Sequence, residues 1–163
     1  MRFSTVFSLS LTLSLLVGLS QADKGLGVRW APFTEGLKTA SAKSKYVFVD
    51  AYADWCGYCK QLDAVTFKAA PVLAELEKNF VSVRLDTESD APLAWKGSKM
   101  TSRQLASRWN IDGLPTLLFL NSKGDVIGSF SSYADPDLMV KLLTYISSGA
   151  RERKVSFEDY VKG

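Results

Sequence analysis

Two cysteines, Cys56 and Cys59, are the only cysteines in the chain, and Gly57 and Tyr58 separate them. They follow an apolar run over 46–53 that is typical of a buried strand. Two thiols at this spacing, where a strand gives way to a helix, can interconvert between a dithiol and a disulfide. Because the N–H groups of a helix N-terminus stabilise a thiolate, we expect Cys56 to be the attacking thiol. We expect Cys59, one turn into the helix and more buried, to be the resolving thiol.

Other functions of a Cys-x-x-Cys pair fit this chain less well. Haem attachment needs a histidine after the second cysteine, but Lys60 stands there and the chain has no histidine. Two cysteines cannot supply the four ligands of a closed zinc site within one chain. A structural disulfide closing so short a loop would restrict the unfolded chain little. The prediction is therefore a redox pair without metal or cofactor, and an inert disulfide and a metal site shared between chains remain as alternatives.

Residues 1–22 predict export. They begin with Met1 and Arg2, continue with a mostly apolar stretch interleaved with Ser and Thr, contain no acid, and end in small residues at 20–22. This pattern is typical of a cleavable signal peptide, and it is too short and serine-rich for a transmembrane helix. An uncleaved N-terminal anchor is the alternative. We expect a periplasmic protein with a single domain over 23–163.

Charge and cysteine count narrow the function classes further. The chain carries 20 basic and 17 acidic residues, a net charge of +3, and loss of residues 1–22 would remove only Arg2 and leave +2. This balance indicates neither nucleic acid nor an anionic membrane as a partner. An exported protein with only two cysteines is also not a disulfide-stapled scaffold, so its thiols indicate chemistry.

Periodicity and turn residues predict an α/β fold, a mixed sheet covered by helices. Residues 87–100 are polar and contain glycine, and we predict a loop there. A capping box at Thr101 and Gln104 opens one helix, and Asp135 caps another. Strands are expected over 27–33, 46–53, 80–86, 117–120 and 126–130, and helices over 34–44, 56–64, 71–79, 101–109 and 135–149, with a last turn or two at 156–161.

Two motifs resemble the thioredoxin superfamily: Trp55-Cys56-Gly57-Tyr58-Cys59-Lys60 after Val49-Asp50, and Gly113-Leu114-Pro115-Thr116 about 55 residues later. The resemblance runs from about 28 to 143 and implies a thioredoxin fold with a central mixed sheet. The Ala-Asp-Trp-Cys stretch, together with 65–67 and 71–72, resembles the C-terminal domain of the transmembrane thiol:disulfide interchange protein. The 87–104 insertion and the tail at 156–160 resemble the exported thioredoxins associated with sulfur oxidation.

This resemblance implies roles at the second motif and around the cysteines. Pro115 matches the cis-proline that faces the disulfide in this family, and Leu114 before it is expected to pair with a substrate peptide as an added strand. The alternative is that Pro115 only marks the start of a strand and has no role at the site. Trp55 is expected to shield the disulfide and contact substrate, or to cap the core, and Gly57 and Tyr58 would line the substrate site.

Asp50 falls where thioredoxins bury a carboxylate behind the resolving cysteine. Burial would raise its pKa and let it take and return the Cys59 proton, whereas a solvent-facing Asp at a strand end is the alternative. The lysine that thioredoxins pair with this carboxylate is expected to be replaced by Ser82.

These features favour a protein-disulfide reductase. Tyr58 cannot stabilise a thiolate by charge as the histidine of strongly oxidising members does, and Leu114 stands where exported isomerases usually have Thr. The expected partners are proteins with disulfides and a membrane thiol:disulfide electron donor, and we expect a monomer. Two alternatives remain: a disulfide oxidase or isomerase on the same fold, and a thioredoxin-fold binding or assembly module without redox turnover.

Overall fold

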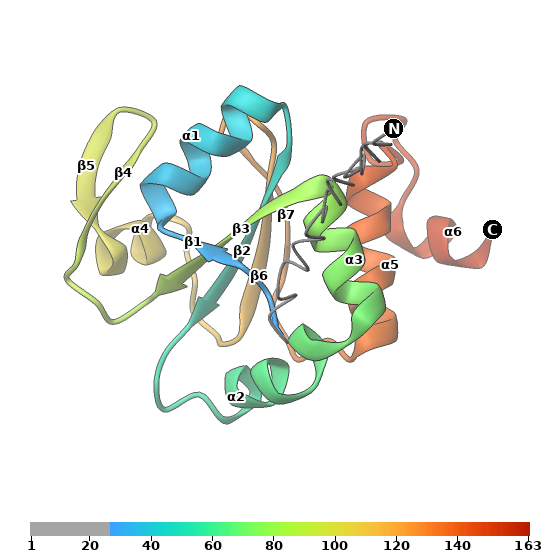
Figure 1. The fold of residues 1–163 in the computed structure, drawn as a ribbon, viewed down its shortest axis with the longest axis horizontal. Helices are drawn as coiled ribbons and strands as arrows, with labels where there is room; N and C mark the ends of the chain where they lie inside the picture. The colour runs from blue at the N-terminus through green and yellow to red at the C-terminus, as the bar shows by residue number, and fades with distance from the viewer. Residues whose placement is uncertain (1–26) are drawn as a thin grey trace, which may run out of the picture.

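A five-stranded mixed sheet forms the centre of the protein, in a computed structural model that describes residues 27–163 (Figure 1). The strand order is β1-β3-β2-β6-β7; β3 is parallel to both β1 and β2, and β6 is antiparallel to both β2 and β7. The strands are β1 (Trp30–Ala31), β2 (Tyr46–Tyr52), β3 (Phe80–Asp86), β6 (Thr116–Leu120) and β7 (Val126–Phe130). The predicted fold class, an α/β thioredoxin fold, is confirmed. The predicted signal segment, 1–22, lies outside the described residues.

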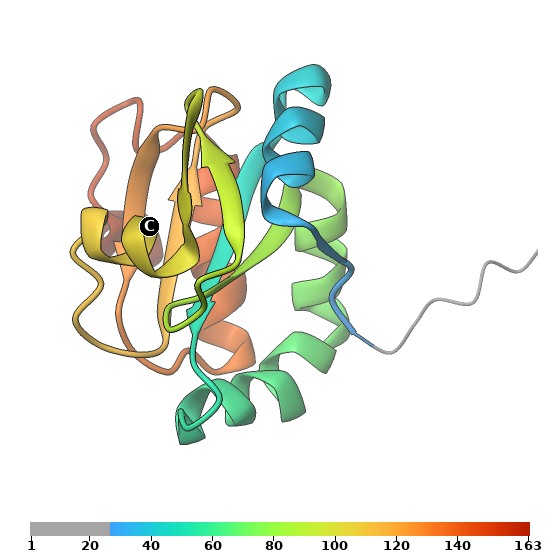
Figure 2. The ribbon, with the colours of Figure 1, turned by 90° about the vertical axis from the view of Figure 1, so that its left-hand side faces the viewer.

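Helices cover both faces of the sheet (Figures 1 and 2). Helix α1 (Phe33–Lys43) and helix α4 (Ser102–Arg108) cover one face, and α3 (Ala70–Asn79) and α5 (Pro136–Ser147) cover the other. Helix α2 (Gly57–Ala64) follows β2 at the end of the sheet and leads through the 3₁₀ turn η1 (Thr66–Lys68) into α3. A short helix, α6 (Phe157–Lys162), packs on α5. Within 27–163 no helix is long and apolar enough to cross a membrane.

Strand β2 is buried on both faces, as its continuous apolar sequence predicts. Phe48 points into the core beneath α3 and α5, while Val47 and Val49 point into the core beneath α1. All three side chains are fully buried. Asp50 is the one charged residue of this strand, so its position inside the protein needs a compensating partner.

The predicted loop over 87–100 is wrong. Strands β4 (Pro92–Trp95) and β5 (Ser98–Thr101) form a hairpin there, and Leu93 is buried in the core beneath α1. Lys96 and Gly97 both have positive φ, 50° and 78°, which is the backbone of a tight hairpin turn. The prediction missed the hairpin because each strand has only four residues and because Lys96, Gly97, Ser98 and Lys99 are residue types typical of a loop.

Other boundaries differ by a few residues. Helix α1 begins at Phe33 after Pro32, and the predicted cap, Thr34, instead accepts a hydrogen bond from the Ala94 amide of the hairpin at 2.9 Å. The opening strand shortens from 27–33 to β1. The capping box at α4 is confirmed, and Asp135 caps α5 as predicted.

Candidate active site

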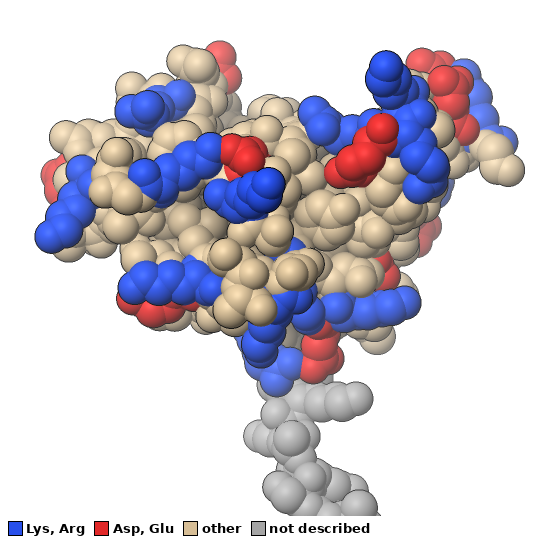
Figure 3. Space-filling view, turned by 90° about the horizontal axis from the view of Figure 1, so that it is seen from above, with Lys and Arg blue, Asp and Glu red and all other residues tan. Residues whose placement is uncertain are grey.

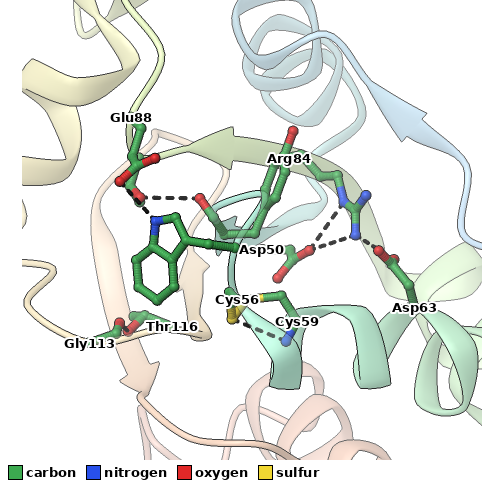
Figure 4. Close-up of a disulfide and its surroundings, with 11 residues drawn as sticks. Asp50, Cys56, Cys59, Asp63, Arg84, Glu88, Gly113 and Thr116 are labelled. Carbon is green, nitrogen blue, oxygen red and sulfur yellow. Dashed lines mark hydrogen bonds and ion pairs between the residues drawn. A yellow bond between two sulfur atoms is a disulfide. The ribbon is translucent and has the colours of Figure 1, made fainter.

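Cys56 and Cys59 form a disulfide at the start of α2 (Figure 4). Cys56 is the N-cap residue, and its sulfur accepts a hydrogen bond from the Cys59 amide at 3.1 Å. After reduction, the same amide and the end of the helix can stabilise a thiolate on Cys56. The expected difference in burial is absent in this oxidised state, because each residue is 3% exposed.

Asp50 is buried, at 1% exposure, so the alternative of a solvent-facing carboxylate is wrong. In Figure 4 its carboxylate lies between the Arg84 guanidinium and the two cysteines. Oδ2 accepts a hydrogen bond from Nε of Arg84 at 3.1 Å and forms an ion pair with Nη2 at 3.0 Å, whereas Oδ1 has no hydrogen-bond partner within 27–163. Burial raises the pKa of Asp50 from its ordinary value of 3.8 to about 6, although Arg84 opposes this rise. A carboxyl of this kind can exchange a proton near neutral pH.

Arg84 is the cation that pairs with Asp50. The expectation that Ser82 stands at the position of the usual lysine is therefore wrong. In the parallel pairing of β2 with β3, Asp50 is opposite Arg84, whereas Ser82 is opposite Phe48. The Arg84 guanidinium also pairs with Asp63 of α2. It lies over the rings of Trp30 and Tyr52, 4.6 and 4.9 Å from their centroids. Arg84 was missed because the strand register decides which β3 residue faces Asp50, and Asp63 was missed because its ion pair joins α2 to β3.

Trp55 is 67% exposed, and a hydrogen bond fixes the position of its indole ring. Its indole Nε1 donates to Oε1 of Glu88 at 2.9 Å (Figure 4). The segment that carries Glu88 is itself attached to β2, because the Thr87 amide and hydroxyl both donate to the Tyr52 carbonyl. Trp55 therefore belongs to the surface around the disulfide and does not cap the core. Glu88 lies in the segment predicted as a loop and was not expected at the site.

Tyr58 is 61% exposed and lies next to a residue that the sequence did not suggest. The Tyr133 ring centroid is 6.1 Å from that of Tyr58, and the ring planes are inclined by 33°. Gly57 is exposed at the start of α2, where an added Cβ would meet nothing within 4 Å. No sequence motif marks Tyr133, which stands in the connection between β7 and α5.

The Leu114–Pro115 peptide bond is cis. Thr116 holds this turn, because its hydroxyl donates to the Gly113 carbonyl at 2.7 Å and is 2.9 Å from the Ser131 hydroxyl. Figure 4 shows Gly113 and Thr116 on one side of the disulfide, with Arg84 and Asp63 on the other. Within 27–163, neither the amide nor the carbonyl of Leu114 bonds to another backbone group. These two groups can therefore pair with an extended peptide.

The described part of the chain contains no candidate metal site. Residues 27–163 contain no group of three or more His, Cys, Asp or Glu side chains arranged to hold a metal ion. The chemistry that the arrangement can perform is the exchange of a disulfide, with a carboxyl able to carry a proton.

A Cys-x-x-Cys disulfide at a helix N-terminus on this sheet defines the class of thioredoxin-fold thiol-disulfide oxidoreductases. The chain belongs to the thioredoxin-like domain family, whose sequence profile matches residues 33–147.

Relatives and solved structures agree with this membership. The chain is 27% identical to the protein disulfide-isomerase of Datisca glomerata over 118 residues, 72% of this chain and 21% of that protein. It is 34% identical to the thiol:disulfide interchange protein DsbD of Vibrio cholerae over 91 residues, 56% of this chain and 14% of that protein. The solution structure of a thioredoxin from Thermus thermophilus superposes with a TM-score of 0.63 at 25% identity, covering 77% of this chain and 93% of the thioredoxin. The chain thus matches only 21% and 14% of the length of these two curated relatives.

Proposed function

We propose that this protein is an exported, monomeric protein-disulfide reductase that cycles Cys56 and Cys59 between dithiol and disulfide. The observation that carries the proposal is the position of the pair. Cys56 caps α2, and its sulfur accepts a hydrogen bond from the Cys59 amide. Buried Asp50, whose Oδ1 has no hydrogen-bond partner among the described residues, lies beside the two cysteines (Figure 4). A binding module without redox turnover would need neither the capped sulfur nor a buried carboxyl with a raised pKa.

The reaction transfers two electrons from the dithiol to a substrate disulfide. The Cys56 thiolate attacks one substrate sulfur, which forms a mixed disulfide and releases the other substrate sulfur as a thiolate. Asp50 accepts the proton of Cys59, and the Cys59 thiolate then attacks the Cys56 sulfur. This second exchange forms the Cys56–Cys59 disulfide and releases the second substrate thiolate, and the two thiolates take up protons.

Two features support these assigned steps. Arg84 occupies only Oδ2 of Asp50, so Oδ1 is available for a proton, and the raised pKa of Asp50, about 6, suits reversible transfer near neutral pH. The free backbone groups of Leu114 support binding of the substrate as an added strand beside Pro115.

The direction of electron flow is part of the proposal. Reduction is supported by Tyr58, which brings no positive charge to stabilise the reduced form, and by the likeness to a relative named as a thiol:disulfide interchange protein. A reductase of this kind must be re-reduced by a dithiol donor, and we place that donor in the membrane. The second candidate is an isomerase or oxidase, which is favoured by relatives named protein disulfide-isomerase.

Export rests on residues 1–22, whose sequence has the features of a signal peptide. Expression of the full chain in a Gram-negative host should give a periplasmic protein whose mass fits a start at Asp23. A full-length mass in the membrane fraction would instead support an anchor.

The reduction potential of the Cys56–Cys59 pair tests the function. Tryptophan fluorescence in graded thiol–disulfide buffers should report the pair, because Trp55 adjoins it. We expect a value near that of thioredoxin, about −270 mV, whereas a value near about −120 mV would replace the reductase with an oxidase. Cys56→Ser is the control and should show no transition. A wild-type protein without any transition would reject redox turnover altogether.

A further inference from the structure

The disulfide is almost completely buried, whereas two aromatic side chains that adjoin it in the sequence are exposed to solvent. Cys56 is 3% exposed, while Trp55 and Tyr58, at 67% and 61%, are the two most exposed large apolar side chains within 27–163. A protein substrate must therefore contact these aromatic rings as its own sulfur approaches Cys56. Exposed aromatic side chains that adjoin a reactive group are characteristic of contact surfaces, because they bury much area with few rotatable bonds.

Tyr133 extends this surface beyond α2. Its ring lies beside that of Tyr58, with centroids 6.1 Å apart, and it packs partly against the core beneath α3 and α5. The Tyr58 ring is thus paired with a ring that is itself partly buried. Such a pair presents a preformed apolar face that need not be ordered when a substrate binds.

The connection that carries Tyr133 is fixed at both ends. The Thr66 hydroxyl donates to the Ala134 carbonyl at 2.7 Å, and both residues are fully buried. On the other side, the Ser131 hydroxyl lies 2.9 Å from the hydroxyl of Thr116, which is the residue after Pro115. The position of Tyr133 is therefore linked both to η1, after α2, and to the turn that contains Pro115. Glu88 fixes Trp55 in a similar way through its indole.

We propose that Tyr58 and Tyr133 form an aromatic wall that binds an aromatic or large aliphatic side chain next to the cysteine of a substrate. The favoured substrates would be extended or unfolded segments of oxidised proteins, in which such side chains are accessible. This inference rests on the proposed function and names its substrate class.

Charges of both signs lie around the motif. Asp54 and Lys60, which border it on either side, are both exposed and have opposite charges, and Glu88 adds an exposed carboxylate beside Trp55. The rings of Tyr58 and Tyr133 offer apolar contact instead, and this contact would distinguish one uncharged segment from another.

Two peptide disulfides provide the test. They are identical except that the residue next to the cysteine is Phe in one and Ser in the other, and kcat/KM is measured for each. We expect the wild-type protein to prefer the Phe peptide. Tyr133→Ala should lower kcat/KM for the Phe peptide about fivefold and change the value for the Ser peptide less than twofold, because an aromatic pair contributes on that scale. Tyr133→Phe should retain the preference.

Control variants separate the wall from general damage. Val126→Ala removes an exposed apolar side chain of β7 outside the site, so it should leave both peptides unaffected. Tyr58→Ala combined with Tyr133→Ala should cost less than the product of the two single losses, because the two rings act as one wall.

Equal losses on both peptides, or a wild-type protein without preference, would overturn the inference. Reduction of a small organic disulfide is measured in parallel, because such a compound tests the redox pair without a neighbouring substrate side chain. Val126→Ala should reduce it at the wild-type rate, and a urea unfolding midpoint close to that of the wild type checks that Tyr133→Ala is folded. If the wild-type protein fails with this compound, the proposed function itself is wrong.

Discussion

One guanidinium serves two carboxylates beside the redox pair. Arg84 donates to the buried Asp50 and pairs with Asp63, which is 46% exposed on α2. If Asp50 carries the Cys59 proton, it alternates between charged and neutral forms in every cycle. Asp63 keeps Arg84 paired while Asp50 is neutral, so the partly buried cation is not left without a counter-charge. The rings of Trp30 and Tyr52 hold the guanidinium in place.

The two partners of this cation predict opposite pH shifts. Arg84 lowers the pKa of Asp50, and Asp63 raises it. Arg84→Gln should therefore move the rise in the rate of mixed-disulfide resolution to higher pH, and Asp63→Asn should move it to lower pH. At pH 6, where about half of Asp50 is ionised, we expect resolution about two- to fivefold slower with Arg84→Gln. It should be at most about twofold faster with Asp63→Asn. Single-turnover rates of product release between pH 5 and 8 measure both.

Two further variants complete this experiment. Arg84→Lys retains the charge without the planar fork, so its profile should lie between those of the wild type and Arg84→Gln. Asp50→Asn should lose the pH-dependent rise. Shifts in the same direction for Arg84→Gln and Asp63→Asn would reject the shared-cation arrangement.

Short motifs in the sequence were enough to predict much of this site. The partner of Asp50 could not be predicted, because it depends on the register of β2 and β3, which only the structure shows. The cysteines, Asp50 and the Pro115 turn lie in short motifs that the sequence displays directly. Arg84 lies on the same face of β3 as Ser82, two residues away, so a shift of two in the assumed pairing selects the wrong partner for Asp50.

At the scale of elements, α1 lies unusually close to β3. A Cβ at Gly36 would come within 2.3 Å of Cγ1 of Val83, a side chain that is fully buried. Glycine here permits close packing of the helix on the sheet. No local pattern predicts this role, because a glycine within a helix by itself indicates only a loss of helix propensity.

Gly36→Ala should destabilise the protein although alanine favours helix. The gain in helix propensity is about 1 kcal/mol, while overpacking a full core costs about 1–3 kcal/mol. We expect a net loss of up to about 2 kcal/mol in the free energy of unfolding, measured by urea titration.

A double variant tests the cause of that loss. Val83→Ala removes the atom that the new methyl group meets, so it should cost less in the Gly36→Ala chain than in the wild type. Additive losses, or a Gly36→Ala chain more stable than the wild type, would contradict the close approach.

The β4–β5 hairpin marks the limit of prediction for elements. Its Trp95 ring packs against Trp109, and Trp95 Nε1 donates to the Gly124 carbonyl in the turn between β6 and β7 at 2.9 Å. These contacts join segments that are distant in sequence, so no local pattern could display them. The two strands were missed because each has only four residues, at the lower limit of what a sequence pattern can indicate.

For the whole molecule, surface charge gives little indication of a partner. On the face seen in Figure 3, basic and acidic side chains lie among large uncharged areas, and several blue groups adjoin red ones. Lys96 pairs with Asp125 and so links the hairpin to the turn after β6. This mixture of signs on that face agrees with the small net charge of +3.

Asp50 also affects the stability of the whole molecule as a function of pH. Its pKa is about 6 in the folded protein and close to 3.8 when it is unfolded, so between these values the folded state binds the proton more strongly. Stability should therefore fall as the pH rises from 4 to 7, and the full cost of an ionised Asp50 is present above about pH 7. A difference of this size corresponds to about 3 kcal/mol.

Asp50→Asn should remove this cost. Urea titrations of the oxidised protein should show the variant about 1–3 kcal/mol more stable than the wild type at pH 7.5, with the difference largely gone at pH 4. Asp63 remains as a partner for Arg84, so the guanidinium is not left unpaired. Asp125→Asn gives the opposite control, because a hydrogen bond from Lys96 lowers the pKa of Asp125. Its carboxylate favours the folded state above its unfolded pKa, so this variant should lose stability at pH 7.5 relative to acid. A stability difference for Asp50→Asn that does not change with pH would mean that the ionisation of Asp50 has no part in it, and the proton-carrier role would lose its electrostatic basis.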